Sequence, residues 1–191
     1  MRFDLRRVII VYAIELLVLT VLSIIGFYIG PLFVNESMIT SLENELRGAT
    51  GLGPNYIFLH NLVIDTLMAI PVVGPFFFVF TLATTGFVLG VFVSYALNSP
   101  IGLVLSLLVT MFFPHGIIEL FAYAFSTSGS LLFTGGIINT IRRRGSVNRD
   151  GGVIAFIIYY VISVILLYIA ANVEYFEITA LKGGIISGMF S

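Results

Sequence analysis

Long apolar runs separated by short polar segments make up most of the chain. A helix that crosses a bilayer needs about 20 consecutive apolar residues, and runs of that length recur along the sequence. Prolines and glycines divide the longer runs, because proline lacks a backbone donor and disfavours helical geometry at the residue before it. The pattern predicts an all-α polytopic membrane helix bundle of about five spans, at residues 8–33, 56–73, 76–97, 101–124 and 153–172.

Three segments break this apolar pattern. Residues 34–55 collect acidic residues with glycine and proline, which predicts a loop with one short helix outside the bilayer. Residues 125–141, which follow a span interrupted by Pro114, are rich in Ser, Thr and Gly, and we expect them to be re-entrant or to lie at the membrane interface. Residues 142–152 form a basic loop. The chain, residues 1–191, is predicted to be a single integral membrane domain.

Basic residues are concentrated in two short segments. Seven of the nine Lys and Arg residues lie within residues 2–7 and 142–149. Cytoplasmic loops carry an excess of Lys and Arg, so both segments are placed in the cytoplasm, and an even number of crossings must separate them. Four of the predicted spans lie between them. The sequence thus predicts a multi-pass protein of the cell (plasma) membrane, with a cytoplasmic N-terminus and the loop at residues 34–55 outside.

The composition narrows the classes of function. Hydrophobic residues make up 59% of the 191 positions and charged residues 10%, whereas soluble proteins carry about 25% charged residues. A formal net charge of -1 argues against a nucleic-acid partner, which needs a basic surface. Cysteine is absent, so disulfides, thiol chemistry and Cys-ligated metal sites are excluded. The expected surroundings are the lipid bilayer and other proteins embedded in it.

Several polar side chains lie inside the apolar runs. An ionisable group in a membrane is energetically costly and normally faces protein or a wet cavity. These polar residues are Glu15, His60, Asn61, Asp65, His115, Glu119 and Glu174. Asn61 and Asp65 are four residues apart, as are His115 and Glu119, so each pair shares one helix face. We expect His115 to hydrogen-bond directly to Glu119.

These polar residues allow three interpretations. In the first, which we favour, they bond to one another and hold helices together. In the second they form a path for a proton or an ion. In the third His115 and Glu119 are half of a metal site that His60, Asp65 or Glu174 completes, because zinc accepts His and carboxylate ligands. We predict no metal and no cofactor.

A helix breaker, an ionisable ring and a flexible residue are adjacent at Pro114, His115 and Gly116. Backbone carbonyls freed at such a break cannot face lipid and must be covered by protein. Broken helices beside re-entrant segments are typical of transporters, and a structural hairpin fits the same pattern. In the third span Gly86 and Gly90 form a small-xxx-small pair, which allows two helices to approach closely, within one chain or between two.

The motif at the helix break carries a resemblance to a known family. Residues 113–120, Phe-Pro-His-Gly-Ile-Ile-Glu-Leu, resemble the Pro-His-Gly-x-x-Glu-Leu motif of the stage II sporulation protein M family. Residues 58–61, 85–90 and 169–176 resemble further family elements in the same order, so the match covers nearly the whole chain. The resemblance implies a multi-span protein that supports engulfment in endospore-forming bacteria, together with peptidoglycan-degrading partners, as a membrane scaffold. It also implies relatives in prokaryotes that do not sporulate.

We therefore expect a non-enzymatic scaffold or assembly subunit, as a homo-oligomer or with other membrane or cell-envelope proteins. A second copy would help to cover residues 125–141, whose backbone must be buried against protein. The runner-up is a small transporter or permease-like subunit that uses the intramembrane His and carboxylate residues. An intramembrane hydrolase ranks third, because nucleophile-elbow, HExxH and paired-aspartate motifs are absent. A scaffold predicts buried, mutually bonded polar groups, whereas a transporter predicts a wet cavity that reaches them.

Overall fold

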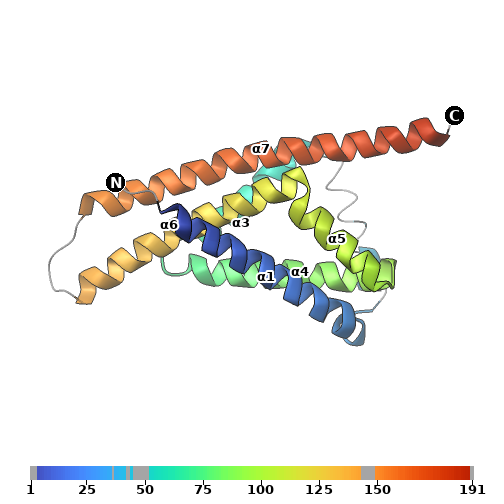
Figure 1. Cartoon of the computed structure of the whole chain (residues 1–191), viewed down its shortest axis with the longest axis horizontal. Coiled ribbons are helices and arrows are strands. Elements are labelled where there is room, and N and C mark those ends of the chain that lie inside the picture. The colour runs from blue at the N-terminus through green and yellow to red at the C-terminus, as the bar shows by residue number, and fades with distance from the viewer. Residues whose placement is uncertain (1–3, 36, 42–43, 45–51, 143–148, 190–191) are drawn as a thin grey trace.

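The chain folds into helices that pack along one another (Figure 1). The computed structural model describes residues 4–35, 37–41, 44, 52–142 and 149–189, without the side chains of 149–151 and 181–189. The helices are α1 (Leu5–Ile29), the short η1 (Gly30–Leu32), α3 (Pro54–Ala69), α4 (Gly74–Ala96), α5 (Pro100–Phe112), α6 (Pro114–Arg142) and α7 (Arg149–Met189). Strands are absent from the described residues. The predicted all-α class is confirmed.

Four helical segments are long and apolar enough to cross a membrane, namely Leu5–Leu32, Gly74–Ala96, Pro114–Arg142 and Gly152–Ala180. The helix α5 is apolar but shorter, with 13 residues. Large apolar side chains remain exposed on these helices, as expected of surfaces that face lipid, for example Leu17, Val104 and Ile165. Length and composition therefore confirm the predicted membrane helix bundle.

The helix boundaries lie close to the glycine, proline and polar residues that interrupt the apolar runs. The spans predicted at 8–33, 56–73 and 76–97 correspond to α1, α3 and α4, each of which begins or ends within a few residues of the expected position. The last predicted span lies inside α7, which extends beyond it at both ends. In the predicted outer loop, residues 37–41 are helical, and residues 36, 42–43 and 45–51 lie outside the described part of the chain.

Two helix pairs form the body of the bundle. The helix α1 packs along α4, and α6 packs along α7, while α3 contacts α4, α6 and α7. Leu19, Met68, Leu120 and Leu167, which come from α1, α3, α6 and α7, are almost completely buried in a common core. Three of the polar residues that the sequence singles out, Glu15, Asn61 and Asp65, are buried as well.

Both ends of the bundle are recognisable in Figure 1. The start of α1, the α3–α4 turn and the end of α6 lie at one end, whereas the α4–α5 turn lies at the other. The basic residues near the start of α1 and at the end of α6 therefore share an end, as an even number of crossings between them requires. Arg143 and Arg144 and the side chain of Arg149 lie outside the described residues. The side of the membrane on which this end lies stays a prediction.

The helix break predicted at Pro114 is confirmed, and the span predicted at residues 101–124 consists of two helices. The helix α5 ends at Phe112, Phe113 is extended with φ -66° and ψ 153°, and α6 begins at Pro114. Proline has no backbone N–H and pushes the preceding residue into extended geometry, yet it fits well at the first position of a new helix. The break thus separates two helices, which diverge sharply in Figure 1.

Residues 125–141 do not form the separate re-entrant segment that the sequence allowed, whereas their place relative to the membrane interface stays a prediction. They form the second part of the continuous helix α6, and residues 126–130 are buried. The Ser130 hydroxyl donates to the carbonyl of Ile70 at 2.8 Å, and the N–H of Val72 donates to Thr134 Oγ1 at 2.7 Å. Val72 has a φ of 71°, a left-handed geometry that a valine rarely adopts. The polar residues of α6 therefore stabilise the strained α3–α4 turn.

This packing changes the argument for a second copy of the chain. Residue Gly129 lies against Tyr159 of α7, so α7 covers the Ser/Thr-rich part of α6 within one chain. One chain therefore buries residues 126–130, whereas residues 131–141 are partly or fully exposed. Homo-oligomerisation stays a prediction that rests on other grounds.

The glycine pair of the third span mediates contact within the chain. A Cβ atom added to Gly86 would lie 2.8 Å from the carbonyl oxygen of Leu19, and one added to Gly90 would overlap the carbonyl of Ser23. Both carbonyls belong to α1, so α1 and α4 approach backbone to backbone. Of the two arrangements left open by the sequence, the structure has the intrachain one.

The arrangement of ends predicts the outcome of cysteine labelling. The chain has no cysteine, so single cysteines at the exposed positions Ser41 and Asn139 are unique labels. With a membrane-impermeant maleimide on intact cells, Ser41→Cys should react, because its segment is expected outside, whereas Asn139→Cys should react only after lysis. Reaction of both cysteines in intact cells would contradict the predicted number of crossings.

Candidate functional site

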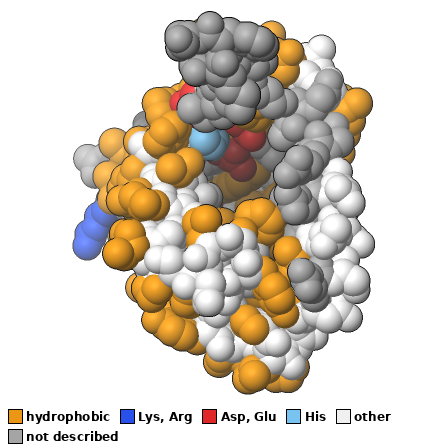
Figure 2. Space-filling view, turned by 90° about the vertical axis from the view of Figure 1, so that its right-hand side faces the viewer, with side chains coloured by type: hydrophobic (Ala, Val, Ile, Leu, Met, Phe, Trp, Pro, Cys, Tyr) orange, Lys and Arg blue, Asp and Glu red, His pale blue; other side chains and the backbone are white. Residues whose placement is uncertain are grey.

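A cavity of about 220 Å³ lies between α1, α3, α4, α5, α6 and α7. Figure 2 shows a hollow with acidic and histidine side chains on one face of the molecule. Polar groups line much of the cavity: His60, Asn61, Thr81, Thr85, Thr110, His115, Glu119, Tyr123 and Glu174. A space of this size accommodates several water molecules or one small solute, since a water molecule takes about 30 Å³. The structure thus brings five of the seven predicted polar residues to one cavity.

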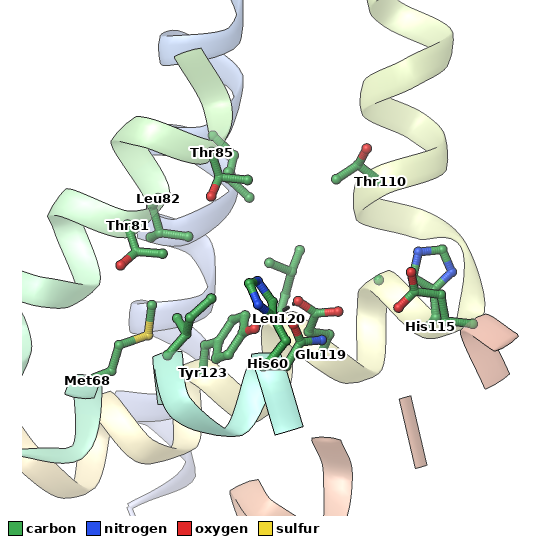
Figure 3. A pocket seen from close by; sticks show the side chains of 15 residues that line it. His60, Met68, Thr81, Leu82, Thr85, Thr110, His115, Glu119, Leu120 and Tyr123 are labelled. Atoms are coloured by element: carbon green, nitrogen blue, oxygen red, sulfur yellow. Dashed lines mark hydrogen bonds between the residues drawn. The ribbon is translucent and has the colours of Figure 1, made fainter. Parts of the chain in front are cut away.

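The labelled side chains of Figure 3 come from opposite walls of this cavity. His60 of α3 and Glu119 of α6 lie near one another, with Tyr123 beside them. Thr85 of α4 and Thr110 of α5 lie across the cavity from this group. The α5–α6 break places Thr110 and His115 on two helices that diverge, so both can line the same space.

His115 of the motif bonds to α7, which the residue spacing did not indicate. His115 Nδ1 lies 2.5 Å from Glu177 Oε2, and Glu119 Oε1 instead accepts a hydrogen bond from the Tyr123 hydroxyl at 2.9 Å. The expected direct His115–Glu119 hydrogen bond is therefore wrong. The physical reason is the length of α7, which continues past the predicted end of the last span and places Glu177 beside the first turn of α6.

The Asn61–Asp65 face connects α3 to two different helices. Asn61 lies close to Glu119 of α6, and both line the same cavity. Asp65 has 0% exposure, and its Oδ2 accepts a hydrogen bond from the Ser163 hydroxyl of α7 at 2.7 Å. These contacts are interhelical polar bonds of the kind that hold membrane helices together. They fit the first interpretation of the polar residues.

Glu15 differs from the other polar residues of the core. Its exposure is 0%, and neither carboxyl oxygen has a hydrogen-bond partner among the described residues. It lies close enough to Glu119 and Asp65 for electrostatic interaction. Three helices, α1, α3 and α6, thus each contribute one carboxyl group to the same buried region.

Glu174 of α7 lies near both histidines. It lines the cavity and interacts electrostatically with His115, His60 and Glu177. His60 is exposed, and its ring stacks near Tyr56 at a centroid distance of 6.4 Å. Among the residues that the structure describes, no group of three or more His, Asp or Glu side chains is arranged to hold a metal ion. The metal interpretation therefore has no ligand set there.

Sequence reasoning missed Tyr123, Ser163 and Glu177. Two of them had a usable signal, because Tyr123 follows Glu119 by four residues and Glu177 follows Glu174 by three, so each pair shares a helix face. Ser163 is a lone hydroxyl in an apolar run, which gives no indication of its partner. All three make side-chain hydrogen bonds to residues that the sequence did single out, namely Glu119, Asp65 and His115.

Comparison with protein-family models matches residues 16–177 to Stage II sporulation protein M. The chain belongs to the stage II sporulation protein M family. Comparisons with curated proteins and with solved structures gave no match. In this family member the Pro-His-Gly-x-x-Glu motif, residues 114–119, forms the start of α6, and its His, Gly and Glu line the cavity.

The pairing of the motif histidine can be measured by a double-mutant cycle. The side chains of His115 and Glu177 are 20% and 17% exposed, so water screens the pair only partly. His115→Ala, Glu177→Ala and the double variant should give a coupling free energy of about 1 kcal/mol in unfolding experiments in mild detergent. A coupling indistinguishable from zero would show that the two side chains do not interact in the folded protein.

Proposed function

We propose that this protein is a permease-like membrane subunit that binds a small polar solute in the cavity beside the Pro-His-Gly motif. The observation that carries this proposal is the cavity itself. It reaches Glu119, Glu174, His60 and His115 within a bundle of apolar helices. A scaffold would need those groups only as interhelical bonds. The cavity is the reason for which we rank the permease-like function above the scaffold, which the sequence favoured.

The lining favours a cation that can also donate hydrogen bonds. Two carboxyl groups, one tyrosine hydroxyl and three threonine hydroxyls face the cavity, and all of them can accept hydrogen bonds. Carboxylates bind ammonium and guanidinium groups with short, charge-assisted hydrogen bonds. A small organic cation fits both the charge and the size of the site.

Water access to the cavity is the first test. Cysteine at Thr85, which lines the cavity, is compared with cysteine at the neighbouring Thr84, which does not line it. In proteoliposomes, a charged methanethiosulfonate reagent should modify Thr85→Cys rapidly and Thr84→Cys slowly, because lipid excludes the reagent from Thr84. Equal slow modification of both would mean that the cavity is closed to water.

Solute movement is the second test. The purified protein is reconstituted in vesicles, and uptake of radiolabelled guanidinium is compared with that of protein-free vesicles. Uptake should depend on the protein and fall by about tenfold in Glu119→Gln, which corresponds to about 1.4 kcal/mol of lost binding. A water-accessible cavity without any protein-dependent uptake would argue against a permease-like function.

A membrane scaffold or assembly subunit is the second candidate, and membership of the stage II sporulation protein M family supports it. In this function the buried hydrogen bonds fix the helices, and other membrane or cell-envelope proteins, or further copies of the chain, dock on the outer faces. Native purification in mild detergent with quantitative mass spectrometry tests it. A stoichiometric partner that is retained in Glu119→Gln would favour the scaffold over the permease.

Both candidates are non-enzymatic and belong to the cell membrane. We propose that the N-terminus is cytoplasmic, because the arginines near the start of α1 share an end of the bundle with Arg142 at the end of α6. The cysteine labelling described above tests this orientation.

A further inference from the structure

Glu15 occupies an unusual position for an acidic residue. It lies in the middle of α1, has 0% exposure, and has no hydrogen-bond donor for either carboxyl oxygen among the described residues. An ionised carboxyl group cannot persist in such surroundings without a compensating charge or donor. Some cationic species must therefore accompany it.

The side chains around Glu15 do not supply that charge. The titratable groups that interact with it are Tyr12 on its own helix, Asp65 on α3, and Glu119 and Tyr123 on α6. The sequences of α4 and α5, which also pack on α1, contain no charged residue. Each identified neighbour is acidic or neutral, so these neighbours increase the need for a positive charge.

A proton meets this need better than a metal ion. No three His, Asp or Glu side chains of the described chain are arranged to coordinate a metal. A proton needs a single oxygen atom, and a protonated carboxyl group loses its charge and gains a donor. Glu15 alone provides the required acceptor.

Glu119 connects this buried group to the cavity. It lines the cavity and interacts electrostatically with Glu15, and the Tyr123 hydroxyl holds its Oε1 at 2.9 Å. We propose that Glu15 is a proton-binding residue of the membrane core and that it is loaded from the polar cavity through Glu119. In this step the O–H bond on the Glu119 carboxyl group breaks and an O–H bond forms on Glu15, which leaves Glu119 ionised. Nothing is oxidised or reduced.

This inference rests on the proposed permease-like function, which it deepens by naming the proton as the coupled ion. In the protonated state Glu15 is neutral and Glu119 is free to hold a cation in the cavity. When Glu15 is ionised, its charge repels that of Glu119 and favours protonation of Glu119 instead. Binding of the solute in the cavity and binding of the proton at Glu15 are thereby linked.

Infrared spectroscopy of the full-length protein in lipid tests the proton site directly. The carbonyl stretching band of a protonated carboxyl group should be present at neutral pH in the wild type. It should also be present in the control Asp4→Asn, which removes an exposed carboxyl group at the N-terminal end of the same helix, α1. The component of the band that comes from Glu15 should be lost in Glu15→Gln. A band that is unchanged in Glu15→Gln, or one that loses this component in Asp65→Asn instead, overturns the assignment.

A second variant at Glu15 and a measurement of the proton-exchange rate test the two parts of the proposal separately. Glu15→Asp retains a carboxyl group in an altered position, so it should shift the band, and an unshifted band overturns the assignment even where Glu15→Gln does not fold. Loading is measured as the rate at which the band shifts in D₂O. This rate should fall by at least about tenfold in Glu119→Gln, and an unchanged rate overturns the route through Glu119. The measurement contains no solute, so its outcome is independent of guanidinium uptake.

Discussion

Replacing Gly90 by alanine is expected to lower the free energy of unfolding by about 3 kcal/mol. The added Cβ would overlap the carbonyl of Ser23 on α1, which is backbone and cannot rotate away. Overpacking of a close interface costs about 1–3 kcal/mol, and a backbone clash belongs at the upper end of that range. Because α1 and α4 form one of the two main helix pairs, we expect a less stable bundle in unfolding experiments in mixed micelles.

The matched control is the same substitution at Gly136 of α6. A Cβ added there meets no atom within 4 Å, so nothing has to move. Alanine is a better helix former than glycine by about 1 kcal/mol, and Gly136→Ala should be neutral or slightly stabilising. Equal stability of Gly90→Ala and Gly136→Ala would mean that α1 and α4 do not approach closely at Gly90.

Some helices were predictable from the sequence and others were not, and the difference has a physical reason. The spans at residues 8–33 and 76–97 were predictable because each is an apolar run bounded by glycine, proline or charge. Residues 125–141 were not, because their serines and threonines bond to the α3–α4 turn about 60 residues earlier in the chain. Their polarity therefore reflects a distant partner, whereas hydropathy treats it as a reason to leave the membrane.

The candidate site was predictable in membership but not in pairing. Spacing correctly placed Asn61 and Asp65 on one face of α3, because both lie on the same helix. It could not identify Glu177 as the partner of His115, since contacts between helices depend on how α6 and α7 are aligned. The cavity was likewise not visible in the sequence, because it depends on the angle between α5 and α6 at the proline break.

Replacing Ser163 by alanine is the second large expected effect. The Ser163 hydroxyl donates to Oδ2 of the fully buried Asp65 at 2.7 Å. Removal of the donor leaves a buried acceptor without this hydrogen bond, which costs about 1–3 kcal/mol. We expect a loss of about 2 kcal/mol in the free energy of unfolding. The control is Thr84→Ala, whose exposed hydroxyl bonds to the carbonyl of Phe80 on its own helix, and which should change stability by less than about 0.5 kcal/mol.

Variants of Asp65 and Ser163 also show whether their hydrogen bond is structural or functional. If the Asp65–Ser163 bond only joins α3 to α7, then replacing both partners with apolar residues, Asp65→Leu with Ser163→Ala, should recover most of the stability lost in Ser163→Ala, because no buried acceptor remains. Guanidinium uptake should then be unchanged, since neither residue lines the cavity. A double variant that is stable but has lost uptake would show that Asp65 acts in transport rather than in packing, and would extend the functional site from Glu119 into the α3–α7 interface.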